Sequence, residues 1–339
     1  MMQISPETQL FIREHSSDDV RVLALQAKKY PDIDMPTAIT QIAGRKVAAE
    51  KIPSWWEIEK IWYPKHLSLE QCSSEITARY KARLLQGDSL TDLTGGFGID
   101  CSFLATGFKS ATYVERQEEL CEIAAHNFPV LNLNHINIKN EDGVTYLQAM
   151  SPVDCLFLDP ARRNEHGGKT VAISDCEPNV AELEELLLQK ANRVMIKLSP
   201  MLDLSLALKE LKQTQEVHIL SVNNECKELL ILLGQTSPAE ISIHCVNLFT
   251  KGTQKEQHFV FTREQEQCSE CTYTDSLETY LYEPNASLLK AGAFRSIAAA
   301  YPVRKLHPNS HLYTSDTFIE NFPGRIFRIV NQCSFNKKK

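Results

Sequence analysis

The clearest pattern along this chain is a series of short apolar runs separated by stretches with helical spacing. The predicted strands are residues 111–115, 136–142, 153–158, 193–198 and 217–222, and residues 153–158 are a near-continuous apolar run. A near-continuous apolar run is typical of a parallel strand that is covered on both faces. Because such runs alternate with helical stretches, for example residues 117–127, the pattern predicts an α/β protein with a doubly wound parallel sheet.

The residues on either side of this repeat have different patterns. Residues 1–87 read as helical: Ser5-Pro6 resembles a helix start, Pro36 opens a further helix, and residues 73–83 form a helix before the first strand. The sheet domain is predicted over residues 88–264 and ends in a hairpin of 240–246 with 257–262.

The last part of the chain reads as a separate small domain. Residues 263–278 are polar and resemble a linker. Beyond them, a strand at 280–283, an Asn-capped helix at 285–300 and strands at 311–313 and 324–330 predict a small α+β domain over residues 279–333.

Composition narrows the class of protein. The chain has 339 residues, of which 43% are hydrophobic and 23% charged, an ordinary globular composition. We find neither an apolar stretch near the ~18 residues of a membrane span nor a secretory signal. The ten cysteines are scattered, so we expect a reducing cytoplasm. The net charge of −7 argues against indiscriminate nucleic-acid binding but permits a local basic face.

A glycine-rich segment follows the first predicted strand. It reads Asp-Leu-Thr-Gly-Gly-Phe-Gly-Ile-Asp over residues 92–100. Glycines there let the backbone pass close to a ligand. A dinucleotide-binding loop needs a third glycine where this chain has Cys101, and a phosphate-binding Gly-Lys-Ser/Thr is missing. The loop therefore indicates another adenosine-containing cofactor.

Asp92, Thr94, Gly96 and Gly98 fit a pattern that resembles motif I of the class I S-adenosylmethionine (SAM) methyltransferases. The resemblance implies a Rossmann-like sheet of seven strands, SAM as the cofactor, and these four residues around its methionine end. The carboxylate of Glu115, about 20 residues past the loop, suits the ribose hydroxyls.

The resemblance extends to two further cofactor contacts and to the reacting centre. It implies that Asp142 lies near the adenine edge and that the helix carrying Thr77 lies against the cofactor. Asp159-Pro160 stands where the family carries motif IV, whose acid accepts a hydrogen bond from a target N–H. Ala161 and Arg162 replace the family's second proline and aromatic. The acid of the pattern for methylation of a base amine is therefore present, but its stacking aromatic is lost or replaced by the plane of an arginine. The basic loop that begins at Arg162 suits a polyanionic substrate.

Lys197 ends a predicted apolar strand. A lysine in such a run is costly unless it is paired, and Asp203 or Glu225 are possible partners. We include Lys197 among the catalytic candidates, with a structural ion pair as the alternative.

Residues 158–163, 197–200 and 283–292 together resemble a bacterial group of class I methyltransferases with a small ferredoxin-like domain and a THUMP-like domain at the C-terminus. The resemblance covers essentially the whole chain. The sequence stops where the THUMP-like part is expected. Because THUMP domains are associated with RNA, the resemblance implies methylation of a base in ribosomal or transfer RNA.

Several alternatives stay open. In one alternative, the substrate is a protein or a small molecule. In another, the chain is a non-catalytic RNA- or ribosome-binding module. The aromatic residues of 55–63 either stack on bases or pack the helical region onto the sheet domain. Cys226 is a weak candidate nucleophile, and the Cys268/Cys271 pair is too isolated to predict a metal site. Arg79 and Arg83 either contact phosphate or form a solvated face.

Overall fold

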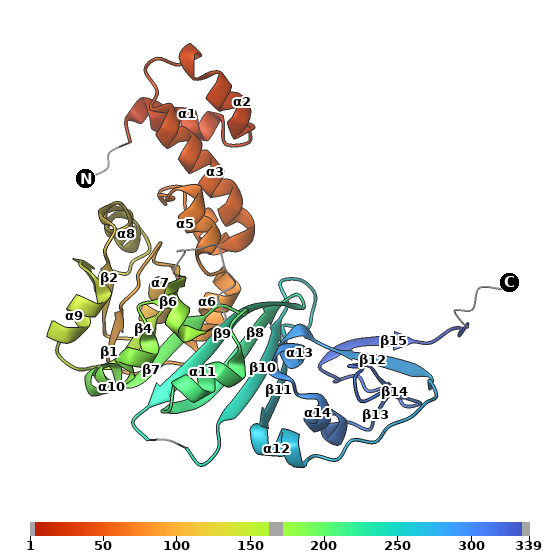
Figure 1. Cartoon of the computed structure of the whole chain (residues 1–339). Coiled ribbons are helices and arrows are strands. Elements are labelled where there is room, and N and C mark those ends of the chain that lie inside the picture. The colour runs from red at the N-terminus through yellow and green to blue at the C-terminus, as the bar shows by residue number, and fades with distance from the viewer. Residues whose placement is uncertain (1–3, 163–171, 237, 334–339) are drawn as a thin grey trace. The chain divides into compact units, whose positions relative to one another are not determined.

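The computed structural model describes residues 4–162, 172–236 and 238–333 (Figure 1). The chain divides into two compact units. Unit 1 comprises Met1–Pro160 and Glu182–Met195, and unit 2 comprises Ala161–Ala181 and Ile196–Lys339. Two elements, α10 (Val180–Lys190) and β7 (Ala191–Leu198), contribute residues to both units.

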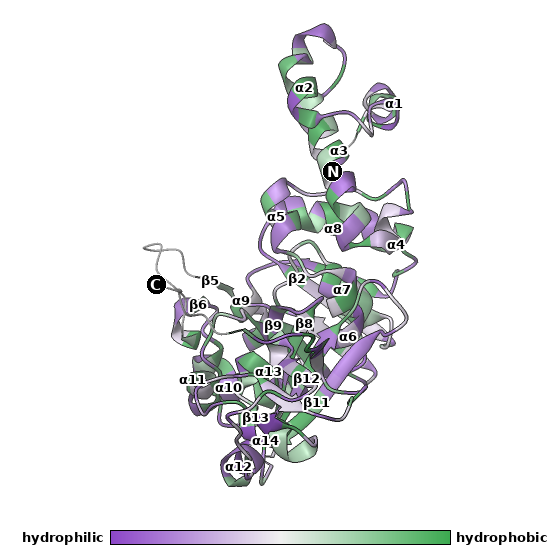
Figure 2. Cartoon of the chain, turned by 90° about the vertical axis from the view of Figure 1, so that its right-hand side faces the viewer, coloured by the Kyte–Doolittle hydropathy of each residue, from purple (hydrophilic) through white to green (hydrophobic). Residues whose placement is uncertain are grey.

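Helices make up the first part of unit 1. They are α1 (Pro6–Glu14), α2 (Val20–Leu25), the 3-10 helix η1 (Ala27–Lys29), α3 (Met35–Lys51), α4 (Pro53–Trp56), α5 (His66–Gln71) and α6 (Glu75–Ala82). Ser5 caps α1 as predicted, since its Oγ accepts a hydrogen bond of 3.2 Å from the Thr8 N–H. Phe11, Leu23 and Ile42 join α1, α2 and α3 in one buried cluster. Apolar and polar stretches alternate along α2 and α3 (Figure 2).

Parallel strands and helices alternate in the rest of unit 1, as predicted. The elements are β1 (Ser89–Asp92), α7 (Ile99–Ala105), β2 (Ser110–Glu115), α8 (Glu118–Val130), β3 (Ile136–Asn140), α9 (Gly143–Ala149) and β4 (Val153–Leu158). The strands lie side by side in the order β4-β1-β2-β3 and are all parallel. Asp92 at the end of β1 lies opposite Phe157 of β4 and Tyr113 of β2, so the carboxyl ends of these strands meet at one edge.

An aromatic cluster packs the helices onto this sheet. Trp55 and Tyr63 are each 2% exposed, and the Trp55 ring meets Phe97 of the glycine loop edge-on at 5.2 Å between centroids. The packing interpretation of the aromatic segment is therefore confirmed for these two residues. Trp56 is different, because it is 42% exposed and lies beside the Arg45 guanidinium.

The larger sheet part of unit 2 contains β8 (Thr214–Val222), β9 (Glu225–Gly234), β10 (Ser242–Leu248) and β11 (Glu256–Thr262), in the order β11-β10-β8-β9. β8 and β10 are parallel, whereas β8/β9 and β10/β11 are antiparallel pairs. The predicted hairpin of β10 and β11 is confirmed. The charged residues 225–228 lie inside β9, which follows a tight turn at Asn223 and Asn224, both at positive φ.

Four short elements complete this part of unit 2. They are β5 (Ala161–Arg162), η2 (Ile173–Asp175), β6 (Cys176–Glu177) and α11 (Leu204–Glu210). β5 and β6 pair with each other in an antiparallel manner.

The predicted small domain is confirmed as a four-stranded antiparallel sheet in the order β13-β14-β12-β15. Its elements are β12 (Tyr280–Pro284), α13 (Ala286–Ala291), α14 (Phe294–Ala300), β13 (Arg304–Lys305), β14 (Tyr313–Ser315) and β15 (Gly324–Arg328). Asn285 caps α13 as predicted, accepting a 3.2 Å hydrogen bond from the Leu288 N–H. The single predicted helix is instead two, because Gly292 at a φ of 75° ends α13.

The segment predicted as a linker also contains structure. Residues Arg263–Cys268 form α12, whose first turn is held by a reciprocal pair of hydrogen bonds between Thr262 and Gln265. Among the described residues, none of the helices combines the length and the hydrophobicity needed to cross a bilayer.

Candidate active site

The glycine loop leaves β1 at Asp92 and enters α7 at Gly98. Gly96 and Gly98 have φ values of 54° and 85°, a region that favours glycine because it has no Cβ. A Cβ built on Gly96 has its nearest neighbour, the Thr94 carbonyl oxygen, at 3.8 Å. At Gly96 the loop therefore leaves space beside the bare backbone, as a cofactor cradle requires.

Asp92 is buried, with 1% of its surface exposed. Its Oδ1 accepts hydrogen bonds from the Thr94 N–H at 2.9 Å and the Thr94 hydroxyl at 3.4 Å. Its Oδ2 is buried and has no hydrogen-bond partner within the described part of the chain. Burial, together with the negative charges of Asp100, Asp159 and Glu115, raises the pKa of Asp92 to about 8. An unpaired buried oxygen among four carboxylates favours a cationic ligand group.

Glu115 holds the glycine loop from the neighbouring strand. It ends β2, is 8% exposed, and its Oε2 accepts a 2.8 Å hydrogen bond from the Gly96 N–H. Its Oε1 accepts another, also 2.8 Å, from the Gln117 N–H. The structure thus brings Glu115 to the loop that the sequence pairs it with, 19 positions away.

Asp142 lies at the start of α9, after β3. Its Oδ1 accepts hydrogen bonds from the N–H groups of Val144 at 3.1 Å and Thr145 at 3.0 Å, and so caps the helix. The side chain therefore has a local structural task in addition to the contact with adenine that the resemblance implies.

Thr94 links the glycine loop to Asp159. The Asp159 N–H donates a 2.6 Å hydrogen bond to the Thr94 hydroxyl oxygen, whose own hydrogen faces Asp92 Oδ1 at 3.4 Å. Asp159 follows the last residue of β4 and is half-buried, and Pro160 beside it is buried. One hydroxyl therefore bridges the residues of motif I and motif IV at the carboxyl edge of the sheet.

A buried ion pair ties α6 to α7 behind the loop. Lys81 is fully buried, and its Nζ lies 2.9 Å from Asp100 Oδ1 and 2.9 Å from the Ser73 hydroxyl. The Ser73 hydroxyl in turn donates to Asp100 Oδ2 at 2.7 Å. Thr77 lies on the same helix, is 1% exposed, and donates to the Ser74 carbonyl at 3.0 Å. Sequence reasoning did not find this ion pair, because its members lie 19 positions apart.

Arg79 of α6 and Arg83, which directly follows this helix, both have protein partners. Arg79 forms an ion pair of 2.7 Å with Glu75, and the Arg83 guanidinium lies over the Tyr80 ring. These contacts favour a solvated charged face over a phosphate site.

The remaining candidates lie in unit 2. Lys197 is 8% exposed on β7. The carboxylates proposed for it have other partners: Asp203 caps α11, and Glu225 lies 2.6 Å from Lys227. The backbone of Arg162 pairs with Cys176 in the β5/β6 ladder. Arg163 and the basic residues of 166–169 lie outside the described residues.

Cys226 is a poor nucleophile. It is partly buried on β9, and burial raises the pKa of its thiol to about 11. The neutral thiol is therefore the predominant form at neutral pH, which argues against a covalent mechanism through this residue.

Comparison with known proteins identifies the family. A family model described as a ferredoxin-like domain matches residues 280–323. A crystal structure from Porphyromonas gingivalis W83, assigned as a methyltransferase, is 34% identical with a TM-score of 0.84, and the match covers 98% of this chain and 84% of that chain. The chain therefore belongs to the family of this methyltransferase.

Other solved structures match a smaller share of the chain. An rRNA methylase from Streptococcus thermophilus is 14% identical, with a TM-score of 0.33 over 47% of this chain and 93% of that chain. TrmK from M. capricolum, in complex with S-adenosylhomocysteine, is 12% identical, with a TM-score of 0.37 over 48% of this chain and 68% of that chain. The search of curated proteins returned no match.

Proposed function

We propose that the chain is a SAM-dependent methyltransferase that methylates a base in RNA, ribosomal or transfer, by direct in-line transfer. The observation that carries the proposal is the arrangement around Thr94. There, a buried carboxylate with an unpaired oxygen and the backbone N–H of Asp159 contact the same hydroxyl at the carboxyl edge of parallel strands. Ligands bind at this edge in doubly wound sheets.

The cofactor assignment rests on charge and space. SAM, when bound, supplies a methyl group activated on a sulfonium. Asp92 faces the cationic methionine end with its unpaired Oδ2, in a field strengthened by Asp100 and Glu115. Gly96 leaves room for the ligand beside the backbone, whereas Gly98 is needed because a Cβ there would lie 3.1 Å from the Phe128 ring.

The other cofactor residues position the nucleoside. Glu115 accepts hydrogen bonds from the ribose hydroxyls while it keeps its hydrogen bond to the Gly96 N–H. Asp142 is proposed to border the adenine, and Thr77 on α6 is proposed to lie against the cofactor. The packing of Phe97 in a buried cluster anchors the loop, which favours a fixed in-line geometry.

Asp159 is the proposed acceptor of the target N–H, with Pro160 fixing the backbone behind it. Arg162 and Lys197 are proposed to bind the polyanionic substrate. The RNA target rests on the sequence resemblance and on the basic stretch of sequence that begins at Arg162. A cytoplasmic RNA also fits the reducing compartment that the scattered cysteines predict.

Calorimetric titration of SAM and S-adenosylhomocysteine into the full chain tests the cofactor. We expect micromolar binding by the wild type, loss in Gly96→Asp, and retention in Asp88→Ala. Asp88 is a matched control, because it precedes the same strand at the opposite end and pairs with exposed Lys109. A folded wild-type protein that binds neither ligand would refute the proposal.

Transfer of labelled methyl groups to RNA tests the substrate. RNA from a strain lacking the gene should accept label from the wild type and from Asp88→Ala. Asp159→Ala should retain SAM binding and RNA binding and lose transfer. Label appearing in protein or in small molecules instead would keep the methyltransferase and reject the RNA target. If the wild type and Asp159→Ala both bind RNA but neither transfers label, the chain is a binding module.

A further inference from the structure

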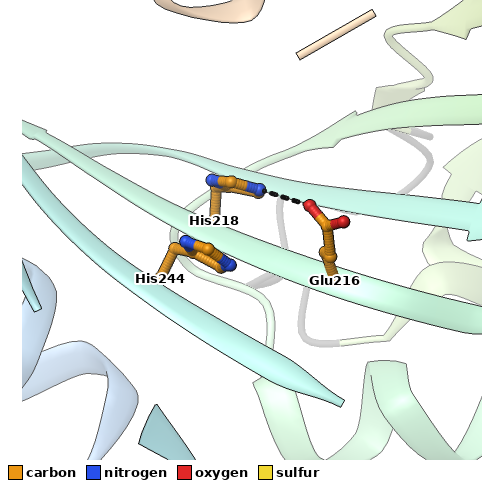
Figure 3. Close-up of side chains that lie close together, drawn as sticks. All are labelled: Glu216, His218 and His244. Atoms are coloured by element: carbon orange, nitrogen blue, oxygen red, sulfur yellow. Dashed lines mark hydrogen bonds and ion pairs between the residues drawn. The ribbon is translucent and has the colours of Figure 1, made fainter. Parts of the chain in front are cut away.

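Three side chains with metal-binding atoms converge on one face of the sheet in unit 2 (Figure 3). Glu216 and His218 come from β8 and His244 from β10. One ligand atom from each lies within 4.8 Å of the other two. Glu216 Oε2 is 3.3 Å from His218 Nε2, and the rings of His218 and His244 stack at 4.3 Å between centroids.

Strand geometry explains the convergence. Glu216 and His218 are two residues apart on one strand, so they project to the same face. His244 is the direct partner of His218 in the parallel β8/β10 ladder. Backbone pairing therefore fixes the positions from which the three side chains project. Small rotations of the side chains are enough to bring their ligand atoms together.

The spacing suits a small divalent ion. Ligands about 2.0–2.1 Å from a tetrahedral zinc ion are roughly 3.4 Å apart. The separation of 3.3 Å between Glu216 and His218 already matches this value. A metal ion bound by both side chains would replace their direct contact.

The three side chains differ in how far they are exposed to solvent. Glu216 supplies a compensating negative charge at the rim, where its side chain is 32% exposed, while that of His218 is only 3% exposed. The set is thus anchored in the sheet and open to solvent on one side.

A fourth residue orients the set. His258 of β11 is exposed, and its Nε2 lies 3.1 Å from His244 Nδ1. With a metal on Nε2 of His244, the Nδ1–H of that ring donates to His258. Such an outer contact fixes the tautomer and the direction of a ligating imidazole.

We infer that Glu216, His218 and His244 form a binding site for a divalent transition metal of the zinc type, with a water as fourth ligand and His258 as a positioning residue. The site lies within unit 2, whereas the proposed cofactor residues belong to unit 1. The sequence patterns alone did not indicate these three residues as metal ligands.

Titration of Zn²⁺ and Co²⁺ into the EDTA-treated full chain tests the site. We expect one ion per chain with a micromolar or lower Kd, and a cobalt absorption spectrum of tetrahedral type without a thiolate charge-transfer band. Glu216→Gln and His244→Asn should weaken binding at least tenfold. His66→Asn, an exposed histidine on α5, is the matched control and should bind as the wild type does.

Cysteine binding is separated by Cys268→Ser. A thiolate band in the cobalt spectrum that disappears in this variant would overturn the proposal. So would the absence of binding by the folded wild type, or equal affinity in Glu216→Gln and His66→Asn. If His244→Asn does not fold, Glu216→Gln decides, because Glu216 lies at the exposed rim. The readout is metal binding, so it is distinguishable from failure of methyl transfer.

Discussion

At the residue scale, Asp92 determines how the proposed cofactor site responds to pH. The carboxyl is fully buried, and its pKa of about 8 is far above the value near 3.9 of an unfolded chain. The folded state therefore prefers the protonated acid. The stability that this preference provides is present below pH 4 and is lost as the pH rises through 8.

Asp92→Asn should remove this loss, because the amide does not ionise and its oxygen still accepts from the Thr94 N–H. The free energy of unfolding of the variant minus that of the wild type should be larger at pH 8.5 than at pH 4. We expect this increase to be at least about 1.4 kcal/mol, the equivalent of one pKa unit. Urea unfolding of both proteins at the two pH values measures the difference. Equal pH dependence in both would contradict the assignment.

A cationic ligand next to Asp92 favours its carboxylate. SAM binding at pH 7 should therefore release nearly one proton from the wild type, since most of the acid is protonated there. Calorimetry in phosphate and in Tris, which differ in ionisation enthalpy, counts the protons. Asp92→Asn should release none if it binds, whereas Asp88→Asn should behave as the wild type does. An equal release from both variants would place the proton elsewhere.

At the element scale, the pairing of α6 with α7 depends on Lys81 and Asp100. Lys81→Met leaves the Asp100 carboxylate without its buried partner, and should lower the free energy of unfolding by about 3–5 kcal/mol. Chemical denaturation measures the change. Lys109→Met, at the exposed pair with Asp88, should leave stability unchanged. A small effect of Lys81→Met would mean that water replaces the lost ammonium.

The N-terminus of α14 depends in a similar way on Glu266 of α12. Its carboxylate accepts hydrogen bonds from the N–H groups of Phe294, Arg295 and Ser296, at 3.0, 2.8 and 2.9 Å. Glu266→Ala should cost about 1–2 kcal/mol, as expected for a lost helix cap with a favourable charge. Thermal unfolding of this variant and of Glu270→Ala, an exposed neighbour, provides the comparison. Equal Tm values would show that the cap is dispensable.

These elements show what a sequence reveals and what it conceals. The glycine loop and the acids at strand ends are local patterns, so Asp92, Glu115 and Asp159 were predictable as members of one sheet edge. The helix α12 also carried a signal, the Thr262/Gln265 capping pair, but its polarity hid it. Lys81 with Asp100, and His218 with His244, are brought together by the tertiary fold from distant positions, and no spacing rule predicts such pairs.

At the scale of the whole molecule, the two proposed ligands belong to different units. SAM should slow amide hydrogen exchange in β1, the glycine loop and β2, whereas Zn²⁺ should slow it in β8 and β10. Mass spectrometry of peptides from the full chain, with each ligand in turn, measures the two patterns. Protection by SAM confined to β8 and β10 would move the cofactor out of unit 1.

The hydroxyl of Thr94 has a thermodynamic consequence. Because it donates toward Asp92 and accepts from the Asp159 backbone, ionisation of Asp92 polarises both contacts together. A ligand that stabilises the Asp92 carboxylate thus alters the setting of Asp159, and a target held by Asp159 alters the affinity for that ligand by the same factor. Binding of the methyl donor and binding of the acceptor would then be coupled through a single oxygen atom, that of the Thr94 hydroxyl.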